Sequence, residues 1–226
     1  MWDAAGFLYV SDETINKIFR VYPNGKKEEV IALGDPDGNT FDREHRLIDC
    51  ASVLRAIIAI TPEGKYKVLA DRFEGKRFNS PNDVIVGPDG ALYFTDPTLD
   101  LVAGEKQEIP FQGVYRLDDK GSVRLLTKDL TQPNGLAFSP DGKRFYIDDS
   151  EQRNIRVYDV GPDMRCASEL LVESFTTGVI GFPVGVPSPV VNKTTLAPAP
   201  TCAVTHSTSL PGVHCRFKPA SVEYSG

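Results

Sequence analysis

A short phrase recurs four times along the chain: a polar Asn or Asp, an apolar run, a tight turn and a second apolar run. Its fullest copy is PNGLAFSPDGKRFYIDD at Pro133–Asp149, and a close copy, PNDVIVGPDGALYFTD, lies at Pro81–Asp96. A looser copy occupies Pro36–Asp49, and a copy without its beginning occupies Trp2–Asp12. The turns of the copies recur roughly every 40–50 residues, which indicates one structural unit repeated along the chain.

Each phrase is followed by two further apolar runs that are joined by a turn of their own. Gly-containing turns between alternating apolar runs predict β-hairpins. Two hairpins per repeat make a four-stranded antiparallel sheet, which is typical of the blades of a β-propeller. A β-sandwich also has closely spaced strands, but its strands have no reason to repeat their turn residues. We therefore predict an all-β propeller with about four blades in this chain. The second hairpins are predicted at Lys17–Ile31, Leu54–Ala70, Gly113–Lys128 and Asn154–Val172.

Composition narrows the class of protein. The net charge of −6 argues against a nucleic-acid partner, and no apolar stretch is long enough to span a membrane. The first residues lack the layout of a secretory signal. We expect a soluble protein, cytoplasmic or periplasmic/secreted, whose native N-terminus is missing from this sequence. The four cysteines show neither CxxC spacing nor a disulfide framework, so the compartment and the oligomeric state stay open.

The composition changes abruptly near residue 173. Residues 174–226 contain a single acidic residue, Glu223, out of 31 in the chain, and seven of the 17 prolines. This stretch has no copy of the repeated phrase. We expect residues 1–173 to form a partial propeller and residues 174–226 to form an irregular Pro- and Thr-rich tail. The tail is either flexible or a sequence that does not belong to the fold, and the abrupt change favours the second interpretation.

Aligning the copies by their turns brings three oxygen-bearing side chains to one position: Asn134 in the fourth copy, Asn82 in the third and Asp37 in the second. In a propeller the first strand of each blade lines the channel, so equivalent side chains converge on the axis. Their oxygens predict a site for a hard divalent cation such as Ca²⁺ or Mg²⁺. The alternative is that these residues only serve turns through local hydrogen bonds.

Other polar residues of the repeats have simpler interpretations. We expect Asp83 to steer its loop or to contact a sugar hydroxyl, with a turn role as the alternative. Asp96 and Asp149 end the second strands of their phrases, so we expect them toward the opposite rim from Asn82, as turn or capping residues. Cys50 ends a predicted strand and is expected to be a small buried apolar residue.

Two long segments resemble a known family. The segment Gly38–Asp100, with GNTFDREHRLIDC, VLADRFEGKRFNSPNDVIV and PDGALYFTDPTLDL, looks like the gluconolactonase / senescence marker protein (regucalcin) family, and so does PNGLAFSPDGKRFYIDDSEQRNIRVYDV. The resemblance covers about Trp2 to Val160. It implies a six-bladed propeller with one divalent metal ion, Ca²⁺, Zn²⁺ or Mg²⁺, in its channel. It also implies hydrolysis of sugar lactones or related esters.

The resemblance assigns roles position by position. Asn134 matches a metal ligand, and Asn82 matches an Asn that contacts substrate or metal. The first ligand of the family is a Glu just ahead of a Trp, and here Trp2 is present without that Glu. The Asp that fits the general-base role lies in a later blade that the composition break has replaced, so the catalytic residue of this chain stays unknown.

We therefore expect a metal-dependent hydrolase that opens a small-molecule lactone and releases a sugar acid, gluconolactonase-like and weakly active as given. The alternative from another class is a non-catalytic propeller that binds a partner or a ligand on its face, because propellers host both roles. A channel with an Asn–Asn–carboxylate cluster supports catalysis, whereas an apolar channel supports a scaffold. A paraoxonase-like or strictosidine synthase-like propeller is a further alternative with the same fold.

Overall fold

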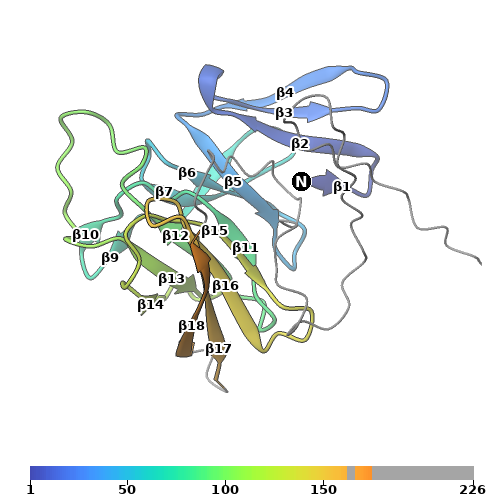
Figure 1. Cartoon of the computed structure of the whole chain (residues 1–226). Coiled ribbons are helices and arrows are strands. Elements are labelled where there is room, and N and C mark those ends of the chain that lie inside the picture. The colour runs from blue at the N-terminus through green and yellow to red at the C-terminus, as the bar shows by residue number, and fades with distance from the viewer. Residues whose placement is uncertain (162–165, 175–226) are drawn as a thin grey trace, which may run out of the picture. The chain divides into compact units, whose positions relative to one another are not determined.

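The computed structural model describes residues 1–161 and 166–174, which lie in one compact unit, Met1–Ile180. Within these ranges the chain forms strands and one short 3₁₀ helix, η1 (Glu13–Ile15), and no helix there has the length and hydropathy needed to cross a bilayer. The strands form four antiparallel four-stranded sheets, which confirms the predicted all-β propeller (Figure 1). The predicted tail lies outside the described residues except for Ser174, which ends the last strand.

Each sheet is one blade, and its four strands follow one another in chain order, as hairpins require. All eight predicted hairpins are present, one phrase copy and one second hairpin in each blade. The blades are, in turn, β1 (Trp2–Asp3), β2 (Phe7–Asp12), β3 (Lys17–Val21) and β4 (Lys27–Ala32); β5 (Pro36–Phe41), β6 (Leu47–Ala51), β7 (Ala56–Ile60) and β8 (Tyr66–Ala70); β11 (Val84–Val86), β12 (Leu92–Asp96), β13 (Gly113–Leu117) and β14 (Val123–Thr127); β15 (Pro133–Phe138), β16 (Arg144–Asp149), β17 (Asn154–Val160) and β18 (Cys166–Ser174). A two-stranded hairpin, β9 (Arg72–Phe73) and β10 (Lys76–Arg77), leads from blade 2 to blade 3.

The core consists of apolar layers between neighbouring blades. Because side chains alternate between the two faces of a strand, Leu92 and Phe94 of β12 pack toward blade 2, whereas Tyr93 packs toward blade 4. The ring of Phe94 stacks on Tyr115 with centroids 5.3 Å apart. Cys50 is a free, fully buried thiol in the layer between blades 2 and 3, which confirms its predicted apolar role. These layers hold the first strands of successive blades side by side.

Two aspartates close the loop that enters their blade. The Oδ2 atom of Asp149 accepts a hydrogen bond from the backbone N–H of Thr131 at 2.6 Å, and its Oδ1 atom accepts one from Gln132 at 3.1 Å. In the same way, Asp96 Oδ2 accepts a hydrogen bond from the backbone N–H of Asn79 at 2.9 Å. The predicted capping role of both residues is therefore confirmed.

The predicted location of these two aspartates, at the opposite rim from Asn82, is wrong. Asp149 lies across from Pro133, the first residue of β15, because the second strand of an antiparallel pair ends where the first strand begins. Asp96 is placed likewise, since the neighbouring Thr95 exchanges backbone hydrogen bonds with the start of the blade. The ends of the second strands and the candidate site therefore share one end of the blades.

Stability should depend on pH through Asp96. This carboxyl is fully buried, and burial raises its pKa to about 8. Between its unfolded pKa near 4 and this value, the folded state keeps a proton that the unfolded chain has lost, so stability falls as the pH rises. We expect Asp96→Asn to make this decline shallower by up to about 1.4 kcal/mol per pH unit.

Urea unfolding at several pH values between 5 and 8 measures the slope of this decline. Asp119→Asn is the matched control, because it removes an exposed carboxylate and leaves the buried one in place. Equal slopes for the wild type and Asp96→Asn would contradict the expectation.

Candidate functional site

The first strands of blades 2, 3 and 4 each carry a β-bulge at the same place. In β5 the pairing register shifts between Pro36 and Asn39, and in β15 it shifts in the same way after Pro133. In blade 3, Thr95 pairs with two residues at once: its carbonyl accepts from the N–H of Asn82 and its N–H donates to the carbonyl of Asp83. A bulge re-aims the side chain that it carries. The two-residue bulges are Asp37–Gly38, Asn82–Asp83 and Asn134–Gly135.

Hydrogen bonds join these three bulges to one another. The N–H of Gly38 donates to the carbonyl of Asn82 at 2.8 Å. The hydroxyl of Thr95 accepts from the N–H of Asp83 at 3.1 Å and donates to the carbonyl of Asn134 at 2.8 Å. Strand β11 is thereby tied to β5 on one side and to β15 on the other. The three residues predicted from the repeat therefore lie on adjacent strands, as the propeller prediction required.

Glycine at position 38 permits this close approach. A Cβ atom on Gly38 would lie 2.3 Å from Oδ1 of Asp83 and 2.8 Å from the carbonyl oxygen of Asn82. Both distances are shorter than any normal carbon contact, so residue 38 must lack a side chain for the strands to meet. The same glycine leaves space into which the carboxylate of Asp83 projects.

A polar side-chain cluster surrounds Asn82, which is 7% exposed. Its Nδ2 atom donates one hydrogen bond to Asp37 Oδ2 and another, 3.2 Å long, to Asp100 Oδ2. Glu13, in η1 of blade 1, accepts a hydrogen bond from the carboxyl group of Asp37. The cluster thus gathers one amide and three carboxyl groups from three blades.

Negative charge is not compensated in this cluster. Burial, and then the neighbouring carboxylates of Glu13 and Asp100, raise the pKa of Asp37 to about 9. Burial also raises the pKa of Glu13 and that of Asp100. Within residues 1–161 none of these carboxyls forms an ion pair with Lys, Arg or His. A cation bound among them would favour their charged forms.

Asp83 is held more firmly than the other carboxyls. It accepts backbone hydrogen bonds from Val84, at 2.9 Å, and from Leu136 of blade 4. Burial raises its pKa to about 6 against the lowering effect of these two donors. Its carboxylate therefore braces two blades, which agrees with the predicted loop-steering role.

The donor set suits a hard cation in chemistry and in charge. Carboxylate and amide oxygens are the ligands that Ca²⁺ and Mg²⁺ take. No group of three His, Cys, Asp or Glu side chains in the described part of the chain is arranged to hold a metal ion by itself. Amide oxygens would therefore have to complete the coordination. Among the described residues no hydrogen bond engages the Asn134 amide, so it is available for this.

The structure brings together two of the predicted metal residues directly and the third through its backbone. Asn82 contacts Asp37 by a side-chain hydrogen bond, whereas Asn134 is joined to their bulges through its carbonyl. Sequence reasoning missed Glu13 and Asp100. Both residues follow shortly after the second strand of a phrase. This position indicates the site only when the second strand is known to end at the same end of the blade as Asn82.

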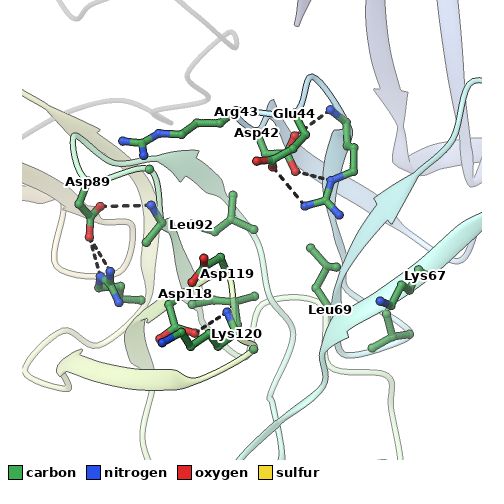
Figure 2. A pocket seen from close by; sticks show the side chains of 17 residues that line it. Asp42, Arg43, Glu44, Lys67, Leu69, Asp89, Leu92, Asp118, Asp119 and Lys120 are labelled. Atoms are coloured by element: carbon green, nitrogen blue, oxygen red, sulfur yellow. Dashed lines mark hydrogen bonds and ion pairs between the residues drawn. The ribbon is translucent and has the colours of Figure 1, made fainter.

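A separate pocket of about 480 Å³ lies between blades 2 and 3, at the opposite end of the strands from Asp37. Figure 2 shows the turn residues around it. Two of its carboxylates form ion pairs: Asp42 pairs with Arg46 at 2.6 Å, and Asp89 pairs with Arg116 at 2.6 Å. These ion pairs brace two turns.

Known proteins resemble this chain over most of its described length. Residues 1–179 match the family described as SMP-30/Gluconolactonase/LRE-like region. A gluconolactonase of Zymomonas mobilis is 37% identical over 143 residues, which are 58% of this chain and 40% of that protein. A pentonolactonase of Haloferax volcanii is 29% identical over 73% of this chain and 60% of its own length. The solved structure of a gluconolactonase from Xanthomonas campestris superposes with a TM-score of 0.71 at 31% identity, covering 76% of this chain and 60% of that one.

The chain spans between two fifths and three fifths of the length of these relatives. The matched region contains all four phrase copies and the cluster around Asn82. The chain therefore belongs to the SMP-30/gluconolactonase/LRE-like family.

Proposed function

We propose that the cluster around Asn82 is the centre of a metal-dependent hydrolase that opens a sugar lactone. The observation that carries this proposal is the group of carboxyls without cationic partners among the described residues, two of them half-buried, at the point where the first strands of three blades are tied together. The names of the relatives, gluconolactonase and pentonolactonase, support a lactone as the substrate. An apolar channel would have supported a non-catalytic scaffold. The cluster around Asn82 is polar, which favours the hydrolase.

Asp37, Asn82 and Asn134 would hold the divalent ion. When bound there, such an ion supplies Lewis acidity toward a carbonyl oxygen and acidifies water. Asn ligands are neutral and leave much of the charge of the ion uncancelled, which suits this chemistry. Asp83, braced by its two backbone donors, would keep the bulge of Asn82 in place and accept a hydrogen bond from a sugar hydroxyl.

Asp100 is the carboxylate best placed to act as general base. Asn82 Nδ2 holds it at 3.2 Å, and burial raises its pKa, which brings it closer to the working range of a base near neutral pH. In the reaction, a water oxygen bonds to the lactone carbonyl carbon while its proton passes to Asp100. The ring C–O bond then breaks, and the ring oxygen takes up a proton to become the hydroxyl of the sugar acid.

The proposal predicts metal-dependent lactone hydrolysis by the full chain. With gluconolactone and added Ca²⁺, Zn²⁺ or Mg²⁺, we expect a rate above spontaneous opening, weak beside that of an intact relative and removed by a chelator. Titration of the released acid at constant pH measures it. A rate equal to the spontaneous one with every metal would refute the proposal.

Asp37→Asn should separate stability from function. Because the pKa of Asp37 is about 9 in the folded protein and near 4 in the unfolded chain, folding at pH 8 must keep a proton that the unfolded chain releases, which lowers stability. Asn has no such cost, so we expect the metal-free variant to unfold at a higher urea concentration than the wild type at pH 8. The same change removes charge from the site, so we expect metal affinity and lactone turnover to fall by about tenfold or more. Asp119→Asn, at an exposed position, should change neither quantity. A loss of stability together with unchanged metal affinity would contradict this assignment.

Thr95 should act as a positioning residue for the site. Thr95→Val keeps its shape but leaves the N–H of Asp83 and the carbonyl of Asn134 without their partner, whereas Thr95→Ser keeps the hydroxyl. We expect Val to cost about 1–3 kcal/mol of stability and to lower metal affinity and kcat, and we expect Ser to retain both properties. Calorimetric metal titration and lactone kinetics measure them. Equal metal affinity in the two variants would show that the hydroxyl serves only folding.

A further inference from the structure

A polar pair replaces an apolar one in the layer between blades 1 and 2. Asn39 of β5 lies directly across from Asp49 of β6. The equivalent cross-strand pairs of the next two blades are buried hydrophobic residues, Val84 with Phe94 and Leu136 with Ile147. Asp49 is 0% exposed, so the blade 2 pair carries a carboxyl group where the fold otherwise places hydrocarbon.

The carboxyl group of Asp49 is not satisfied by the protein. Among residues 1–161 and 166–174 its Oδ1 atom has no hydrogen-bond partner, and its Oδ2 atom lies 3.5 Å from the hydroxyl of Ser11 on β2 of blade 1. The Ser11 hydroxyl accepts a 3.0 Å hydrogen bond from Nδ2 of Asn39. No ion pair to Asp49 exists in the described part of the chain. A buried carboxyl in this state carries a large desolvation cost unless something else binds it.

The spacing of these oxygens suits a shared cation better than a hydrogen bond. Hydrogen bonds between oxygens are usually about 2.7–2.8 Å long, so 3.5 Å is a poor one. Two oxygens bound at right angles to one Ca²⁺, each at 2.3–2.6 Å, lie about 3.3–3.7 Å apart. A half-turn of the Asn39 amide would place its oxygen where Nδ2 now lies, beside the Ser11 hydroxyl.

We propose that Ser11, Asn39 and Asp49 form a second cation site, selective for a hard divalent ion such as Ca²⁺. The site joins blade 1 to blade 2 and shares no residue with the cluster around Asn82, although the charge of Asp37 acts on Asp49. It stands apart from the proposed hydrolase function, since none of its residues belongs to the proposed catalytic machinery. Water and backbone carbonyls complete the shell, and with one carboxylate we expect weak affinity, with Kd on the order of 10⁻⁴–10⁻³ M.

The test uses the full chain, with CaCl₂ as the probe. Equilibrium dialysis counts the bound ions, and thermal unfolding reports their effect on stability. Two variants remove the site: Asp49→Asn, which keeps the shape, and the double variant Asn39→Leu with Asp49→Ile, which copies the apolar pair of blade 4 and should fold without the ion. Asp37→Asn is the comparison variant, because it weakens the other site.

We expect both Asp49 variants to bind one Ca²⁺ fewer per chain than the wild type. At a Ca²⁺ concentration ten times Kd, the wild type and Asp37→Asn should gain about 3–5 °C in Tm from this site, and the Asp49 variants should lose that gain. Equal Ca²⁺ stoichiometry in the wild type and the double variant would overturn the proposal. If only Asp37→Asn lowered Ca²⁺ binding, the second site would be rejected and the hydrolase proposal would stand. If only the Asp49 variants lowered Ca²⁺ binding, the second site would stand and the metal site of the hydrolase proposal would be rejected.

Discussion

The pairing of two residues against one at the start of the first strands of blades 2, 3 and 4 is the constraint on which the site depends. Because each bulge turns its first side chain out of the regular alternation, Asp37, Asn82 and Asn134 are aimed away from the apolar layers between blades. Hydrogen bonds from Gly38 and through the Thr95 hydroxyl then hold these bulges beside one another. Repetition of one local irregularity thus builds a polar centre inside an otherwise hydrophobic fold.

That polar centre is costly for the folded chain. Burial raises the pKa of Asp37 to about 9, and the surrounding carboxyls add to the effect. A group of acids that forms no ion pair within the described ranges destabilises the metal-free protein and favours a cation that can bind there. The ion pairs that the described residues form lie elsewhere, as in the turns that carry Asp42 and Asp89 (Figure 2). The paired charges therefore brace turns, whereas the carboxyls around Asn82 remain available to bind a cation.

The repeat made much of the fold predictable, because Gly turns and apolar runs are local signals. Strand alignment also brought Asn82 and Asp37 together in advance. Glu13 and Asp100 escaped prediction because they lie in connections outside the repeated phrase, whose paths depend on tertiary packing. The predicted location of Asp96 was wrong because the second strand of an antiparallel pair ends beside the start of the first strand. The burial of Asp49 could not be read from its strand, which looks ordinary in composition.

The glycine of the second bulge links the identities of residues far apart in the chain. Since a methyl group on Gly38 would collide with the carboxylate of Asp83, the volume available at one position is set by the occupant of the other. Natural relatives that carry a larger residue at the first position should carry a smaller one at the second. The two positions would then vary together, and a variant with a larger residue at position 38 needs a shorter side chain at position 83.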